Sequence, residues 1–128
     1  MLEKLIQQLG RELQMEDLIT STGTNEYTLP FADNIQVEAS ELKHNILLKG
    51  NIAPCPKKNE EAFIIRVLET NLFGAGTRGA SIGLKDEGNM LTLSRELDYN
   101  SSYKEFTENL EDFISVITFW RNETLKHQ

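Results

Sequence analysis

Apolar residues recur with a helical period in three stretches of the chain. The N-terminal stretch follows an i, i+3, i+4, i+7 pattern, which predicts an amphipathic helix with a polar outer face. The same period predicts a second helix over about residues 60–73, capped by Asn59, and a third from about Ser102 to beyond Trp120. The N-terminal stripe consists of Leu2, Leu5, Ile6, Leu9 and Leu13.

Alternating apolar and polar residues, which are typical of half-buried strands, occupy the stretches between the predicted helices. The five predicted strands are 27–31, 35–39, 46–52, 80–84 and 90–94. The polar stretch 20–25 ahead of them reads as a loop. Pro30 marks the first strand as an edge strand, because proline cannot donate a ladder hydrogen bond.

The resulting order of elements is α-β-β-β-α-β-β-α. Short turns between consecutive strands favour antiparallel pairing, so the predicted fold class is α+β, with a mainly antiparallel sheet and the helices packed on one face. The second helix is apolar around most of its circumference and therefore needs cover on two sides. A second subunit is a natural cover in a chain of 128 residues.

Length and composition indicate a single globular domain over residues 1–128, with 39% hydrophobic and 26% charged residues. No apolar run is long enough to span a membrane, and the N-terminus lacks the features of a signal peptide. The net charge of −7 and the scattered basic residues argue against binding to nucleic acid or insertion into membranes. A lone cysteine, Cys55, agrees with a reducing compartment, so we expect a cytoplasmic protein.

The residue types that carry chemistry do not form a recognisable site. The glycines of residues 74–79 have dinucleotide-loop spacing, but they follow a predicted helix and precede a predicted strand, the reverse of what that site needs. His44 and His127 have no second ligand at metal-binding spacing, and nothing near Cys55 in the sequence activates its thiol. The sequence therefore predicts no catalytic residues, no metal site and no cofactor, and a protein that is not an enzyme.

One block of the sequence carries a family resemblance. Residues 71–89, Asn-Leu-Phe-Gly-Ala-Gly-Thr-Arg-Gly-Ala-Ser-Ile-Gly-Leu-Lys-Asp-Glu-Gly-Asn, resemble the centre of type III secretion chaperones of the Tir chaperone (CesT) family. In that family a helix ends in an Asn-Leu-hydrophobic-Gly phrase and passes through small residues into a hairpin. Arg78 and Lys85 depart from the family pattern, in which glycine and an acidic residue are common. The resemblance covers nearly the whole chain, including the late Trp120.

The resemblance implies a dimeric, ATP-independent chaperone in the cytoplasm of a virulent bacterium with a type III secretion apparatus. Such a protein binds the N-terminal non-globular segment of one or a few effectors, keeps it extended and secretion-competent, and presents it to the export machinery. Its partners would be effector polypeptides and either a second copy or a related chaperone. By position, the resemblance implies a dimer interface at Phe63, Val67, Leu68, Leu72, Phe73, Ile82, Leu84 and Leu91.

An extended client would pair with a sheet edge through main-chain hydrogen bonds and place apolar side chains beside the first helix and the sheet. The expected effector-binding residues are Leu2, Leu5, Ile6, Leu9, Phe31, Ile35, Val37 and Leu47. Leu47 draws attention because it is apolar on an otherwise polar strand face. Ordinary core packing is the competing interpretation for each of them.

Two alternatives stay open. A regulatory interaction module of the same fold could sequester a transcription component or pair with another chaperone subunit. A small enzyme with an acid pair that no motif reveals is the third possibility.

Overall fold

The computed structural model describes residues 2–55, 62, 63, 65, 66, 69, 80–85 and 90–126. Its helices and strands, in chain order, are α1 (Leu2–Leu13), β1 (Thr20–Gly23), β2 (Glu26–Phe31), β3 (Ile35–Glu41), β4 (Asn45–Pro54), β5 (Ser81–Lys85), β6 (Met90–Asp98) and α3 (Tyr103–Lys126). Between β4 and β5, the described residues 62, 63, 65, 66 and 69 are helical, within the stretch where the second helix is predicted.

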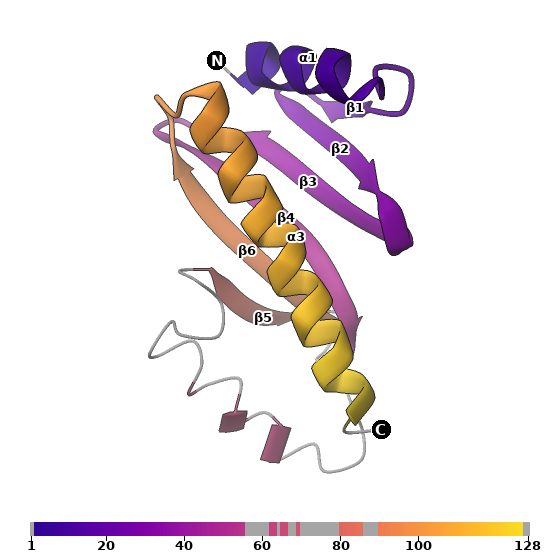
Figure 1. Cartoon of the computed structure of the whole chain (residues 1–128). Helices are drawn as coiled ribbons and strands as arrows, with labels where there is room; N and C mark the ends of the chain where they lie inside the picture. Colours follow the sequence, from indigo (N-terminus) through magenta and orange to yellow (C-terminus); the bar gives the residue numbers. More distant parts are fainter. Residues whose placement is uncertain are drawn as a thin grey trace.

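The described strands form one antiparallel sheet in the order β1-β2-β3-β4-β6-β5 (Figure 1). The longest pairing joins β4 to β6, from Asn45 opposite Asp98 to Pro54 opposite Met90. A tight turn joins β2 to β3, and Asp33 and Asn34 in it have left-handed backbone angles, with φ of 60° and 57°. The predicted α+β fold with a mainly antiparallel sheet is confirmed.

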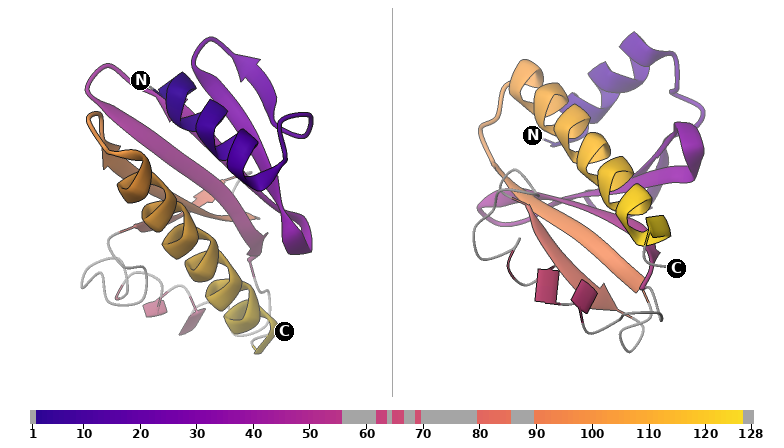
Figure 2. Two further views of the ribbon diagram at one scale, coloured as in Figure 1. Left: turned by 45° about the horizontal axis from the view of Figure 1, so that its top comes forward. Right: turned by 60° about the horizontal axis from the view of Figure 1, so that its bottom comes forward.

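The helices α1 and α3 lie on one face of the described sheet, with α3 running diagonally across β4 and β6 and α1 lying near β1 and β2 (Figures 1 and 2). Strand alternation explains this layering, since Ile35, Val37 and Ala39 of β3 are buried beneath the helices and the residues between them, Gln36 and Glu38, are exposed. The same residues that give α3 its apolar stripe fill the core. They are Phe106, Leu110, Phe113, Val116, Ile117 and Trp120.

The predicted start of the third helix near Ser102 agrees with the structure, in which α3 begins at Tyr103. Ser102 and Glu105 form a reciprocal capping box: the Glu105 N–H donates to Ser102 Oγ at 3.1 Å, and the Ser102 N–H donates to Glu105 Oε1 at 3.3 Å. In α1, the apolar stripe is buried except for Leu13, which is 54% exposed. The helix ends at Leu13, and Gln14 (φ 54°) turns the chain back before this side chain can reach the core.

The prediction for residues 20–25 is wrong, because Thr20–Gly23 forms strand β1. This strand lacks apolar alternation and exists through its pairing with β2, for example Ser21 opposite Tyr27. Consequently β2 is not the edge of the sheet, contrary to the prediction from Pro30. The pairing with β1 stops at Thr28, however, so Pro30 lies where β2 has no neighbour on that side and no donor is needed.

Gly50 in the middle of β4 allows α3 to pass unusually close to the sheet. A Cβ atom at this position would lie 2.8 Å from Ile117 Cδ1 and 3.3 Å from Phe113 Cε1. Glycine is thus required here by space, not by backbone angles.

Candidate functional site

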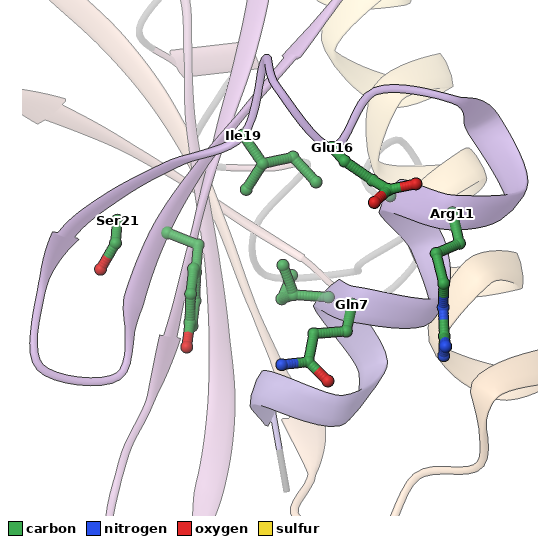
Figure 3. A pocket seen from close by; sticks show the side chains of 8 residues that line it. Gln7, Arg11, Glu16, Ile19 and Ser21 are labelled. Atoms are coloured by element: carbon green, nitrogen blue, oxygen red, sulfur yellow. The ribbon is translucent and has the colours of Figure 1, made fainter.

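A groove of about 410 Å³ lies between α1, the loop that follows it, and strands β1 and β2 (Figure 3). Ile6 of α1 and Ile19 of the loop supply its apolar surface, together with the ring of Tyr27 from β2. Gln7, Arg11, Glu16 and Ser21 place polar groups around it, and Gly10 completes the lining. A mainly apolar hollow with a few polar groups suits part of an extended polypeptide or a small organic group.

Gly10 brings the loop close enough to form one wall of this groove. A Cβ atom at Gly10 would lie 3.3 Å from both Glu16 Cγ and Ile19 Cδ1. The Met15 N–H donates to the Gly10 carbonyl at 2.9 Å, so the chain reverses directly at the end of α1. This reversal carries Ile19 back over the helix face that also presents Ile6.

Two carboxylates tether α1 at its opposite ends. At the first turn, the Leu2 N–H donates to Glu41 Oε1 of β3 at 2.8 Å, and this bond holds the pKa of Glu41 below its ordinary value. At the last turn, the Tyr103 hydroxyl donates to Glu12 Oε2 at 2.8 Å. Burial and this bond raise the pKa of Tyr103 to about 12. The helical wall of the groove is therefore fixed to both the sheet and α3.

The charged groups at the groove are available to a ligand. Within the described ranges, no ion pair or side-chain hydrogen bond engages Arg11 or Glu16. Gln7 makes one long contact, its Nε2 donating to Glu3 Oε1 at 3.4 Å. Burial, followed by the charges of Glu3 and Glu41, raises the pKa of Tyr27, so its ring presents a neutral phenol to the groove at physiological pH.

Strand β1 places an open sheet edge beside the groove. β1 is the terminal strand of the described sheet, and its four residues are all exposed. Its outer edge therefore offers main-chain donors and acceptors to a further strand. The bulge between Ser21 and Gly23 interrupts the pairing with β2 at Thr22.

The expected effector-binding residues differ in how deeply they are buried in the structure. Six of them lie in the core of the single chain, namely Leu2, Leu5, Ile6, Leu9, Ile35 and Val37. Phe31 and Leu47 are half-buried, and Leu47 lies on the sheet face opposite the helices. Only Ile6 among the eight also lines the groove.

Sequence reasoning missed the other groove residues, above all Ile19 and Tyr27. Ile19 follows Leu18 in a short apolar pair between two polar stretches and belongs to no periodic pattern. Tyr27 is predicted only as a strand residue. A strand at residues 20–23 would have been the signal that brings them together.

The expected dimer-interface residues also divide by burial. Phe63, Ile82 and Leu91 are buried within the chain, whereas Leu84 is 47% exposed on the edge strand β5. Phe63 packs edge-on against Trp120, with ring centroids 6.2 Å apart. The remaining four, Val67, Leu68, Leu72 and Phe73, lie outside the described residues.

Metal-binding clusters and membrane-spanning helices are both absent from the described residues. No cluster of three or more histidine, cysteine, aspartate or glutamate side chains is arranged to hold a metal ion there. Within the same part of the chain, no helix is both long and apolar enough to cross a membrane.

Within the described residues, the six-stranded antiparallel sheet with α1 and α3 on one face matches the fold of type III secretion chaperones. The chain belongs to the Tir chaperone protein (CesT) family, whose sequence model matches residues 4–121. The predicted family resemblance is thereby confirmed.

The chain is also similar to individual proteins and solved structures. The chain is 26% identical over 125 residues to the Chlamydia pneumoniae protein CPj0713/CpB0740, covering 96% of this chain and 95% of the relative. Its fold is similar to a chain of the ExsC–ExsE complex, with a TM-score of 0.77, 15% identity and coverage of 93% and 90%. It is also similar to a chain of the HopA1–SchA chaperone–effector complex, with a TM-score of 0.71, 14% identity and coverage of 94% and 92%. The Yersinia pestis secretion chaperone SycH, in complex with a fragment of YscM2, gives a TM-score of 0.68 at 14% identity, with full coverage of both chains.

Proposed function

We propose that this protein is an ATP-independent chaperone that binds the N-terminal non-globular segment of type III secretion effectors and keeps it extended and secretion-competent. The observation that carries the proposal is the apolar groove beside the open edge of β1, within a chaperone-family fold. An extended segment can use both features at once, because its main chain pairs with the edge while alternate side chains point toward the groove.

The energetics of such a contact require a long client segment. Burying one large apolar side chain contributes roughly 1.5–3 kcal/mol. Association costs an estimated 4–15 kcal/mol in lost freedom, so a single anchor in the groove is insufficient. Several anchors along one extended chain are needed, which fits a segment that wraps the chaperone better than a short motif.

The proposal extends what is known of related complexes. The HopA1–SchA structure is a chaperone–effector complex, and the SycH structure holds a fragment of YscM2. We assign this chain the same kind of polypeptide partner, a cytoplasmic location, delivery of the client to the export machinery, and no catalytic step.

A pair of neighbouring substitutions tests the groove. Ile19→Gln introduces a polar side chain into the groove lining, whereas Leu18→Gln makes the same kind of change next to it, at a side chain that is 61% exposed and does not line the groove. The measurement is calorimetric affinity for N-terminal segments of secreted proteins encoded beside this gene. We expect Ile19→Gln to weaken binding about tenfold, since part of one buried apolar contact is lost, and Leu18→Gln to leave it unchanged.

Three results count against the proposal. The first is that no secreted protein co-purifies with the chain or binds to it in the calorimeter. The second is that the two variants bind with equal affinity, and the third is that a transcription component is recovered in place of an effector. The last result would favour the regulatory alternative. Thermal melting of both variants confirms that each one is folded.

Dimerisation is the second part of the proposal. Leu84 on β5 is 47% exposed and Ile65 is 50% exposed, although both are large apolar residues, and a second copy of the chain would cover them. Leu84→Asn should shift the protein toward monomer in light scattering at micromolar concentration. Leu42→Asn is the matched control, because Leu42 is 41% exposed but follows β3 near the opposite end of the sheet. A wild-type protein that is monomeric under these conditions would contradict the dimer.

A further inference from the structure

A gap between two central strands is filled by an arginine from α3. The pairing of β3 with β4 starts at Val37 opposite Gly50 and does not extend toward the β2–β3 turn. Arg121 occupies this end of the sheet: its Nε donates to the Ile52 carbonyl at 2.7 Å and its Nη1 to the Asp33 carbonyl at 2.7 Å. Its Nη2 donates to the Asn34 carbonyl at 3.2 Å. Arg121 thus replaces the missing ladder bonds between the two strands.

The same arginine lines a hollow of about 400 Å³ that is distinct from the groove beside α1. Most of the lining comes from residues that point away from the two helices, since they alternate with buried residues of β3, β4 and β6. The side chains that surround it are mainly polar. They are Asn34, Gln36, Glu38, Lys49, Asn51, Thr92 and Arg121, with Leu84 as the apolar member.

The hydrogen-bonding capacity of this hollow is largely unused. A guanidinium has five N–H donors, and Arg121 spends three of them on carbonyl oxygens. Within the part of the chain that the structure describes, no ion pair engages Arg121 or Lys49, although Glu38 lies directly opposite Lys49 in the sheet. The same holds for the side chains of Asn51 and Thr92, which neighbour each other across β4 and β6 and make no hydrogen bond there.

The local charge is opposite to that of the protein as a whole. Two cationic side chains and one carboxylate line the hollow, in a chain whose net charge is −7. The guanidinium of Arg121 is held by three carbonyls and keeps one N–H on each Nη atom for an oxygen ligand. Amide and hydroxyl donors beside it can complete the bonds of such a group.

We propose that this hollow binds the carboxylate of an aspartate or glutamate side chain of the bound client. Arg121 and Lys49 supply the positive charge, and Asn51 and Thr92 supply neutral donors. The assignment of this carboxylate to a client rests on the proposed chaperone function, whereas the ability of the hollow to bind a carboxylate does not. The site gives an acidic chaperone a way to fix the register of a client at one acidic residue, against the general repulsion between like charges.

The first arm of the test uses free acetate as the probe. Backbone amide shifts of the ¹⁵N-labelled protein are followed during titration at pH 7 and constant ionic strength, with acetamide as the neutral isostere. We expect saturable shifts at Gln36, Asn51 and Thr92 with acetate and none with acetamide. Lys49→Gln should weaken the acetate affinity at least threefold, whereas Lys104→Gln, on the exposed start of α3, should not change it.

The second arm uses the client segment. Each aspartate and glutamate of the client segment is replaced in turn by asparagine or glutamine. We expect one of these replacements to lower the affinity of the segment for the wild-type chaperone without lowering its affinity for the Lys49→Gln variant. The site is overturned by an absence of saturable acetate shifts, by equal effects of acetate and acetamide, or by an unchanged acetate affinity in Lys49→Gln. If acetate binds as expected and no effector segment binds, the proposed function fails and the carboxylate site stands.

Discussion

The close approach of α3 to β4 makes Gly50→Ala a stringent test of the packing described above. The new methyl group would lie 2.8 Å from Ile117 Cδ1, closer than carbon atoms approach without rearrangement. Its distances to Phe113 Cε1 and to the Gln36 carbonyl oxygen would both be 3.3 Å. The backbone oxygen cannot move far, so the Ile117 side chain must rearrange within a core in which it is fully buried.

The expected cost follows from two opposing effects. Overpacking a well-filled core costs about 1–3 kcal/mol. Replacing glycine by alanine restricts the unfolded chain and returns about 0.4–1 kcal/mol. We therefore expect Gly50→Ala to lower the free energy of unfolding by about 1–2 kcal/mol, which corresponds to a fall in Tm of about 4–8 °C in a domain of this size.

A second substitution removes the clashing atom itself. Ile117→Val deletes Cδ1 and alone costs about 0.5–1.5 kcal/mol. In the double variant the methyl group introduced by Gly50→Ala occupies the space that Cδ1 leaves, so the combined cost should fall short of the sum by about 1 kcal/mol. Urea unfolding, followed by the fluorescence of Trp120, the only tryptophan, measures all four proteins at one fixed concentration. Additive or larger-than-additive losses would refute the contact between Gly50 and Ile117.

Three further outcomes are expected. Glu123→Gln removes a carboxylate that is 6% exposed and pairs with Arg66 at 2.9 Å and Lys126 at 3.2 Å. Urea unfolding should show that the free energy of unfolding falls by roughly 1–3 kcal/mol. The control Glu108→Gln, at the exposed pair with Lys104, should lower it by less than about 0.5 kcal/mol. The pKa of Tyr103 is raised to about 12 in the folded state, whereas the ordinary pKa of tyrosine is 10.0. The folded protein therefore keeps the Tyr103 proton at a pH where the unfolded chain loses it, so the contribution of Tyr103 to stability should be intact below pH 10 and be lost between pH 10 and 12. Tyr103→Phe should show a smaller loss of stability over that range. The pKa of Glu41 is lowered from 4.5 by the Leu2 N–H, so its contribution should be present above pH 4.5 and be lost as the pH falls below it. The hydrogen-exchange protection factor of the Leu2 amide, taken relative to the intrinsic rate at each pH, should fall there in the wild type but not in Glu41→Ala.

Local patterns were sufficient to predict most of the fold. The stripe of α1 and the start of α3 near Ser102 are encoded within a few residues, and both agree with the structure except for the exposed Leu13. β1 could not be predicted in the same way, because its four residues carry no alternation and are strand only through β2. The groove depends on that unpredicted strand, so its residues Ile19 and Tyr27 were also missed.

Arg121 illustrates the same limit more sharply. Its position near the end of a helix predicts only a favourable interaction with the helix dipole. Its actual partners are the carbonyls of Asp33, Asn34 and Ile52, which lie 88, 87 and 69 residues away in the sequence. Main-chain carbonyls have no sequence signature, so neither this contact nor the hollow that it lines could be derived from residue types alone.

The two sites differ in what they can contribute to client recognition. The groove beside α1 supplies apolar area, which gives affinity but discriminates weakly among large apolar side chains. The hollow around Arg121 supplies oriented donors, which favour a carboxylate and penalise an apolar group that leaves those donors unpaired. The groove lies on the helix-covered face at α1, β1 and β2, whereas most of the hollow lies on the opposite face of β3, β4 and β6. A client that uses both sites must therefore pass round an edge of the sheet from one face to the other. Such a client has to match apolar and acidic residues at a set separation, and that separation, more than either contact alone, would give the chaperone its selectivity.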